Sequence, residues 1–122
     1  MIGYITLGCN DLPRAVAFYE ALLGGELGAT RTWASDTGVS WGVKRGPNLA
    51  VMKPFNGEVA TAGNGTMVAL AMRNKEDVDR VYAKAISLGG TDEGPAGPRG
   101  EGFYAGYFRD LDGNKLCAFF MG

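Results

Sequence analysis

The predicted order of elements occurs twice in this chain, and this duplication constrains the fold more than any single motif. Similar residues recur at an offset of 63 in the first strand and helix (Ile5/Val68, Leu7/Leu70, Tyr19/Tyr82) and of 65 after the helix (Gly25/Gly90, Lys44/Arg109, Phe55/Phe120, Gly57/Gly122). The 122 residues are the usual size of one domain. We therefore expect a single domain, with repeat one at about 1–57, a linker at 58–65 and repeat two at about 66–122.

The first repeat predicts a strand, a helix and three further strands. Asp11 and Pro13 have the residue types of a helix N-terminus, and Gly24-Gly25 predicts its end. Between them, apolar residues follow the spacing of a buried helical stripe: Leu12, Ala15, Tyr19, Leu22 and Leu23. The strands are predicted at Tyr4 to Cys9, Leu27 to Trp33, Val39 to Lys44 and Leu49 to Lys53.

The second repeat begins with the same elements. A strand is predicted over Thr66 to Arg73 and a helix from about Lys75 to Leu88, ended by Gly89-Gly90. Thr91 to Gly102 is rich in Gly and Pro and is predicted to be a loop. Two strands follow, Phe103 to Arg109 and Lys115 to Phe120, joined by the turn Asp110-Leu111-Asp112-Gly113.

These elements predict an α+β fold of two βαβββ repeats. Two curved, antiparallel-rich sheets would surround a concave cavity, with the helices outside. Because side chains alternate along a strand, Tyr4, Thr6, Met67 and Ala69 are expected to point away from the helices. The concave side is the expected pocket.

Charge and composition exclude several function classes. Twelve Lys and Arg balance thirteen Asp and Glu, so nothing in the net charge favours binding to nucleic acid or to a membrane surface. The chain contains no His, which excludes Ser-His-Asp and Cys-His catalysis and His-ligated metal sites.

The two cysteines and the first residues bear on the compartment. Cys9 and Cys117 lack CxxC spacing and are interpreted as reduced, buried thiols, with a redox pair as the alternative. Met1 to Leu7 has no basic region followed by an apolar run, and no stretch of the sequence is apolar for long enough to span a bilayer. We expect a cytoplasmic protein.

Three stretches of the chain resemble the vicinal oxygen chelate superfamily, which includes glyoxalase I, extradiol dioxygenases, fosfomycin resistance enzymes and bleomycin resistance proteins. They are Ile5 to Leu12 followed by Ala15 to Tyr19, Gly65 to Leu70, and Tyr107 to Leu116. The last is the most specific, because it resembles the family's strand, Asp-Pro-Asp-Gly turn and final strand, with Leu111 in the Pro place. The resemblance covers the whole chain and implies the family's fold.

The resemblance also implies where metal ligands would lie. The family's four ligand positions, usually His and Glu or Gln, fall on Tyr4, Met67, about Met52 and Cys117. None of these is a ligand type of the family, and hard divalent ions favour carboxylate or imidazole ligands. We therefore predict no metal and no cofactor; a Cu(I) site from Met and Cys is the alternative, and Tyr fits it poorly.

The pocket would instead be lined by apolar and aromatic side chains. Aromatic residues cluster on the strands predicted to border it, and alternation lets about half of them face a ligand. Arg99 precedes such a strand and could clamp an anionic group. The residues expected to contact a ligand are Tyr4, Trp41, Met52, Met67, Arg99, Phe103, Tyr104 and Cys117.

The sequence and the resemblance together favour a metal-independent small-molecule-binding protein of the glyoxalase/bleomycin resistance family. The alternative is a divergent, metal-free, glyoxalase-like lyase or isomerase that uses Glu101 or Cys117. A third hypothesis gives the chain a role in protein association alone. The resemblance also implies a homodimer.

Overall fold

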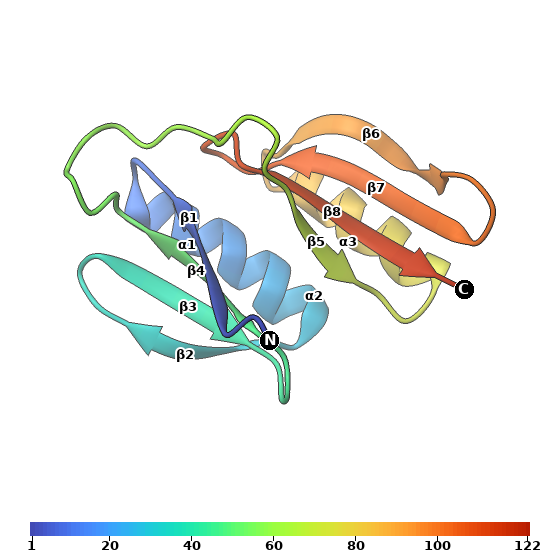
Figure 1. Ribbon diagram of the computed structural model, residues 1–122, viewed down its shortest axis with the longest axis horizontal. Helices are drawn as coiled ribbons and strands as arrows, with labels where there is room; N and C mark the ends of the chain where they lie inside the picture. Colours follow the sequence, from blue (N-terminus) through green and yellow to red (C-terminus); the bar gives the residue numbers. More distant parts are fainter. The chain divides into compact units, whose positions relative to one another are not determined.

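The chain divides between Thr61 and Ala62 into two units with the same order of elements, shown in the computed structural model of residues 1–122 (Figure 1). In each unit one strand precedes a helix and three strands follow it. The predicted duplication is therefore confirmed at the level of element order. The division falls inside the segment 58–65 that the sequence predicts to be a linker.

The first unit, Met1–Thr61, has a four-stranded mixed sheet in the order β1-β4-β3-β2. β1 pairs with β4 in parallel, and the other neighbours are antiparallel. Helix α1 lies on one face of the sheet, where it contacts β4 (Figure 1). The elements are β1 (Tyr4–Gly8), α1 (Leu12–Tyr19), the π-helical turn η1 (Glu20–Gly24), α2 (Gly25–Leu27), β2 (Thr30–Ala34), β3 (Gly38–Gly42) and β4 (Asn48–Met52).

The second unit, Ala62–Gly122, repeats this topology with the order β5-β8-β7-β6. Its parallel pair is β5 with β8, and α3 packs on β6, β7 and β8. None of the helices in either unit is long and apolar enough to cross a membrane. The elements are β5 (Val68–Ala71), α3 (Lys75–Ser87), β6 (Thr91–Pro98), β7 (Phe103–Arg109) and β8 (Lys115–Met121).

The first helix begins as predicted and ends later than predicted. The Asp11 carboxylate accepts the Arg14 N–H at 3.2 Å, and Pro13 lies in the first turn, where no N–H partner is needed. The predicted end at Gly24-Gly25 is wrong, because the helix continues through a π turn and α2 to Leu27. It stops at Gly28, whose φ of 70° is a left-handed conformation that glycine adopts without strain.

The prediction that 91–102 is a loop is also wrong, because most of it forms β6. This strand lies at the edge of its sheet, so Pro95 has no ladder hydrogen bond to lose on its outer side. Two register shifts, between Asp92 and Gly94 and between Gly94 and Gly97, interrupt its pairing with β7. These irregularities let a Gly- and Pro-rich segment remain in the sheet.

Each unit buries its core between the helix and one face of the sheet. In the first unit Trp41 is 1% exposed, and its ring centroid lies 6.0 Å from that of Tyr19 in α1. The Trp41 indole N–H has no hydrogen-bond partner, so this side chain contributes by packing alone. In the second unit, fully buried Phe108 and Leu116 lie on the sheet and Val78 and Val81 on α3.

The strand ladders show which positions of the two units correspond. Ile5 pairs with Leu49, and Val68 pairs with Leu116. The first strands of the two units are thus offset by 63 residues, as predicted. In the last strands, Leu49 and Leu116 are 67 residues apart, so the predicted offset of 65 is wrong there. By this register, the counterpart of Met52 is Phe119, and that of Cys117 is Ala50.

The hairpin after the helix more than accounts for the increase in offset from 63 to 67, because the equivalent residues Arg31 and Asp92 before it are only 61 apart. Arg31 pairs with Trp41, ten residues later in the chain, while Asp92 pairs with Phe108, sixteen residues later. Trp41 and Phe108 are equivalent buried positions on the helix-facing side of β3 and β7. The β6–β7 hairpin is therefore six residues longer than its counterpart.

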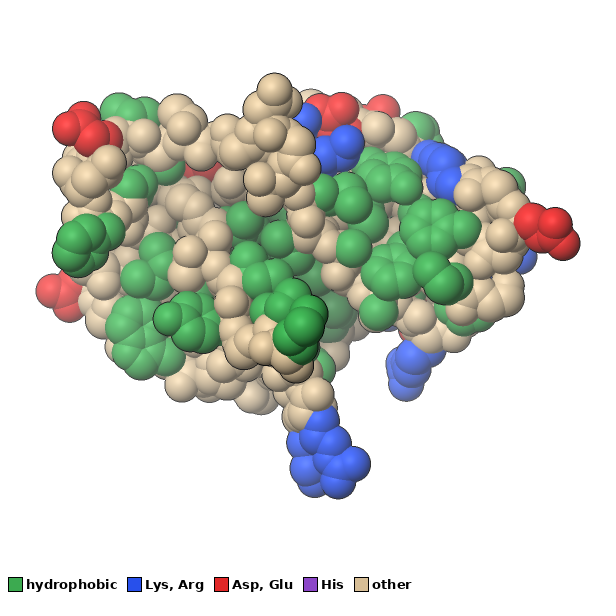
Figure 2. All heavy atoms as spheres, in the orientation of Figure 1, with side chains coloured by type: hydrophobic (Ala, Val, Ile, Leu, Met, Phe, Trp, Pro, Cys, Tyr) green, Lys and Arg blue, Asp and Glu red, His purple; other side chains and the backbone are tan.

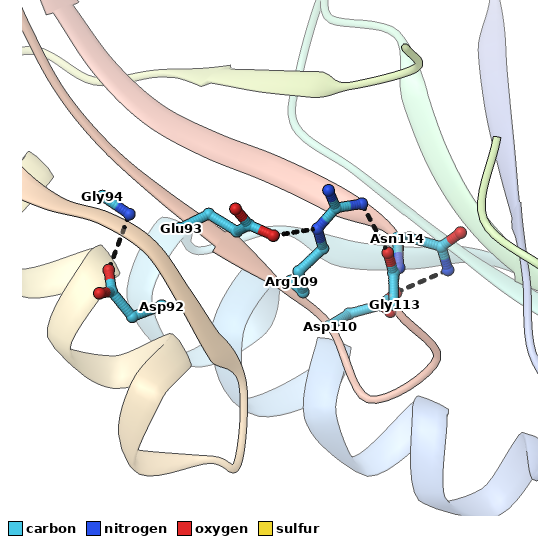
Figure 3. A network of polar contacts seen from close by, with 7 residues as sticks. All are labelled: Asp92, Glu93, Gly94, Arg109, Asp110, Gly113 and Asn114. Atoms are coloured by element: carbon cyan, nitrogen blue, oxygen red, sulfur yellow. Dashed lines mark hydrogen bonds and ion pairs between the residues drawn. The ribbon is translucent and has the colours of Figure 1, made fainter. Parts of the chain in front are cut away.

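The turn between β7 and β8 is held by a buried aspartate (Figure 3). One carboxylate oxygen of Asp110 accepts the N–H groups of Asp112 and Asn114, both at 2.9 Å. The other accepts the Asn114 side-chain amide at 2.9 Å. This confirms the turn predicted at Asp110 to Gly113, and it explains why a carboxylate stands where the chain reverses.

Two tyrosines join α3 to the second sheet. Tyr82 in α3 donates its hydroxyl to Asp92 at 2.7 Å, and Tyr104 in β7 donates to Asp79 of α3 at 2.6 Å. Burial, followed by the hydrogen bond and charge of Asp92, raises the pKa of Tyr82 from 10.0 to about 12. The hydrogen bond to Asp79 is the main cause that raises the pKa of Tyr104.

We expect the protein to lose stability between pH 10 and about pH 12 as Tyr82 ionises. A folded-state pKa above the unfolded value adds stability that is fully present below pH 10 and is lost as pH rises toward 12. Urea unfolding at several pH values should show this loss in the wild type and a smaller one in Tyr82→Phe. Tyr4→Phe, which removes a hydroxyl without an acidic partner, is the control. Equal slopes in all three proteins would contradict the assignment.

Candidate functional site

The sheet of the first unit has an open face, opposite α1, that holds a pocket of about 380 Å³. The ladder puts its lining residues on one side of the sheet, since Tyr4 pairs with Asn48, Thr6 with Ala50 and Ser40 with Ala50. Figure 2 is drawn from the same side as Figure 1 and shows apolar side chains gathered there. The pocket is lined by Tyr4, Thr6, Thr32, Trp33, Ser40, Asn48, Ala50 and Met52.

The lining combines apolar surface with neutral hydrogen-bonding groups. The hydroxyl oxygens of Thr32 and Ser40 lie 2.6 Å apart and share a hydrogen bond, and Ser40 is buried. Trp33 is 47% exposed, so much of its ring is available for stacking. No lining residue carries a charge at neutral pH. Such a pocket suits an uncharged ligand with a flat apolar part and a polar edge.

A loop from Lys53 to Thr61 borders this face and forms two further hollows of about 660 and 690 Å³. The side-chain amide of Asn10 anchors the loop through two hydrogen bonds to Ala60. Its Nδ2 donates to the Ala60 carbonyl at 3.2 Å, and its Oδ1 accepts the Ala60 N–H at 2.7 Å. Tyr4 and Met52 line the 660 Å³ hollow as well as the 380 Å³ pocket. The two spaces therefore share a wall.

The structure brings together two of the three first-unit residues expected to contact a ligand. Tyr4 and Met52 line the same pocket. Trp41 lies on the other face of its strand, in the core against Tyr19.

Sequence reasoning put Thr6 on the pocket side of its strand but missed the rest of the polar lining: Thr32, Ser40 and Asn48. The alternation of Val39-Ser40-Trp41 and Asn48-Leu49-Ala50-Val51 could have indicated two of them, because small or polar residues alternate there with large apolar ones.

The open face of the second unit is defined by the residues that pair with or lie beside Cys117. Cys117 pairs with Ala69 on β5 and with Tyr107 on β7, and Phe119 pairs with Ala105. Phe103 stacks on Phe119 with ring centroids 5.6 Å apart. The face comprises Ala69, Phe103, Ala105, Tyr107, Lys115, Cys117 and Phe119.

The remaining predicted residues have different positions in the second unit. The Arg99 guanidinium carbon lies 5.5 Å from the Tyr107 ring centroid. Tyr104 faces α3 through its bond to Asp79, so it is not on the open face. Met67 precedes β5 and is 42% exposed, and Glu101 is exposed in the β6–β7 turn. Arg99, Phe103 and Cys117 thus share a face, and Tyr104 does not.

The Cys117 thiol is a poor nucleophile where it stands. It is 1% exposed, and burial raises its pKa, with a smaller opposing effect from Lys115 and the Leu70 N–H. A raised pKa keeps sulfur in the unreactive thiol form at neutral pH. Cys9 is equally buried, and both cysteines are free thiols.

No group of three or more His, Cys, Asp or Glu side chains is placed to hold a metal ion. The four positions at which the family resemblance implies metal ligands are occupied by Tyr4, Met52, Met67 and Cys117. Only Tyr4 offers an oxygen, and it is a neutral phenol.

The comparisons with known proteins agree on one family. The Glyoxalase/Bleomycin resistance protein/Dioxygenase superfamily model matches residues 1–118. A crystal structure of a glyoxalase/bleomycin resistance protein from Albidiferax ferrireducens T118 is 36% identical, with a TM-score of 0.91, covering 100% of this chain and 99% of that one. No curated protein sequence matches the chain.

Two more distant solved structures share the fold. A glyoxalase-related enzyme from Fulvimarina pelagi is 24% identical with a TM-score of 0.78, and the match covers 98% of this chain and 87% of that chain. A glyoxalase/bleomycin resistance protein/dioxygenase family enzyme from Burkholderia phytofirmans PsJN is 14% identical with a TM-score of 0.78, and the match covers 98% of both chains.

Proposed function

Because the chain belongs to the glyoxalase/bleomycin resistance protein/dioxygenase superfamily, we propose that it is a metal-independent small-molecule-binding protein. The ligand lies in the 380 Å³ pocket on the open face of the first unit. It is uncharged, with a flat apolar part and at least one hydrogen-bonding group. A homodimer, which the family resemblance implies, stays a prediction.

One observation carries this proposal: a ligand-sized pocket that is lined by two exposed aromatic rings and by polar side chains, without any charged group. Its volume of about 380 Å³ lies within the range of small-molecule sites. Trp33 and Tyr4 offer rings for stacking, and Asn48 offers both a donor and an acceptor. An ionic ligand would lose its hydration there without gaining a counter-charge, which disfavours it.

Metal independence is supported by the chemistry of the donor set. Hard divalent ions require carboxylate, carbonyl or imidazole ligands in sets of several. The pocket lining has one amide, three hydroxyls and one phenol, but no carboxylate and no imidazole. These residues do not fit the family's metal, so no step of the proposed function depends on one.

No observation favours the alternative of a lyase or isomerase. Cys117 is buried with its thiol protonated, and Glu101 is exposed in a turn with no side chain placed to orient it. A general base must reach the proton that it removes. Small-molecule binding is therefore the proposal that the positions of these residues support best.

The test is binding of N-phenyl-1-naphthylamine, an uncharged aromatic probe whose fluorescence rises in apolar sites. We expect saturable binding to protein treated with EDTA, and no change on adding zinc or nickel. Thr6→Phe should weaken the affinity by about tenfold or more, because the new ring occupies the pocket while an aromatic residue suits the strand. Thr91→Phe, at an exposed position of β6, is the matched control.

Three results would contradict the proposal. The first is the absence of saturable binding, and the second is equal affinity in Thr6→Phe and Thr91→Phe. The third concerns the metal: if native mass spectrometry shows one retained metal ion per chain after incubation with nickel or zinc, metal independence is wrong.

A further inference from the structure

We propose that the open face of the second unit carries a binding site for a small oxyanion, a carboxylate or phosphate group, formed by Arg99, Tyr107 and Lys115. None of these three residues lines the uncharged pocket of the first unit. The site neither depends on the proposed function nor supports it.

Two cations lie over one aromatic ring. The Arg99 guanidinium carbon is 5.5 Å, and the Lys115 ammonium nitrogen 5.6 Å, from the Tyr107 ring centroid. Lys115 lies on β8 and Tyr107 on β7, so the ladder brings them to the same face, while Arg99 follows the end of β6. Both contacts are in the range of cation–π interactions, which position the two positive groups around the ring.

Backbone carbonyls orient the Arg99 guanidinium. Its Nη2 donates to the Pro95 carbonyl at 2.5 Å, and its Nη1 donates to the Pro98 carbonyl at 3.2 Å. Gly94 leaves the necessary room, since a Cβ there would lie 3.2 Å from Arg99 Nη2. A guanidinium has five N–H donors, so three remain for an anion. The planar arrangement of these donors suits a carboxylate or phosphate.

Neither cation has a carboxylate partner. The neighbouring Arg109 shows the contrast, because its Nε lies 2.7 Å from Glu93 Oε1 (Figure 3). No acidic side chain is within ion-pair distance of Arg99 or Lys115, although Glu101 lies only two residues from Arg99 in the chain. Two positive charges held near one ring repel each other, and an oxyanion bound by both would relieve that repulsion.

The test is titration of the full chain with inorganic phosphate and with acetate at low salt, followed by two-dimensional NMR. We expect saturable shifts of the Arg99 Nε–H signal and of amides around Tyr107 and Lys115 with at least one probe. Arg99→Gln and Lys115→Gln should each weaken that binding by about tenfold. The control is Lys44→Gln, which removes one positive charge at an exposed position of the first unit. Its affinity should stay at the wild-type value.

The controls separate a specific site from a general charge effect. The inference is overturned if neither probe shifts the Arg99 signal, if either site variant keeps wild-type affinity, or if Lys44→Gln loses as much affinity as the site variants. A preference for phosphate over acetate, or the reverse, identifies which oxyanion the site takes. The uncharged naphthylamine probe reports on the first unit, so its failure to bind leaves this result unaffected.

Discussion

Replacement of Trp41 by alanine is expected to lower the free energy of unfolding by about 3–5 kcal/mol. The side chain is 1% exposed and packs against Tyr19 of α1, so its removal leaves a large cavity between helix and sheet. Its indole N–H has no partner, and the loss therefore reflects packing rather than a broken hydrogen bond. Urea unfolding followed by far-ultraviolet circular dichroism measures the change.

The second tryptophan is the matched control. Trp33 lies in the pocket wall and is 47% exposed, so Trp33→Ala should cost about 1 kcal/mol or less in stability. The same variant should weaken binding of the uncharged probe, because it removes a stacking surface. Similar stability losses in the two variants would contradict their assignment to core and pocket wall.

Asp110→Ala should destabilise the protein by about 2–4 kcal/mol. The variant removes the acceptor of three hydrogen bonds in the β7–β8 turn, and two of them come from backbone N–H groups. Figure 3 shows Asp110 beside Asn114, which donates two of the three. Buried donors left without a partner cost free energy in full. The unfolding midpoint in urea should fall, with a similar dependence on denaturant concentration.

Two further variants make this prediction specific. Asp110→Asn keeps one acceptor oxygen and should recover part of the loss. Asp36→Ala, an exposed aspartate between β2 and β3, should change stability by about 0.5 kcal/mol or less. Equal stability of Asp110→Ala and Asp36→Ala would show that the Asp110 hydrogen bonds do not stabilise the turn.

Much of the fold was predictable because local signals agreed with tertiary packing. Asp11 and Pro13 indicated the start of α1, and the Asp110 turn was recognisable from its residue types. The end of α1 was not, because packing of Leu22 and Leu23 favours continuing the helix beyond Gly24-Gly25. β6 was missed for a related reason: its pairing with β7 outweighs the low strand propensity of glycine and proline.

The candidate site was less predictable than the fold. Alternation indicated that neighbouring residues such as Ser40 and Trp41 face opposite ways, but not which way each one faces. Trp41 was predicted to face the pocket. Its ring instead lies on the opposite side of the sheet, where Tyr19 of α1 packs against it. The correspondence of Met52 with Cys117 failed because register shifts in β6 and the longer hairpin cannot be read from residue types.

The longer β6–β7 hairpin shows where a duplicated domain of this kind can diverge. Its additional residues lengthen β6 and β7, and Phe108 keeps the buried position that Trp41 has in the first unit. The longer hairpin thus presents further side chains, Arg99 among them, while this core position is filled in both units. The tip of this hairpin, between Pro98 and Phe103, is the place where a protein engineer could graft a recognition loop and leave the packing of Phe108 and Trp41 intact.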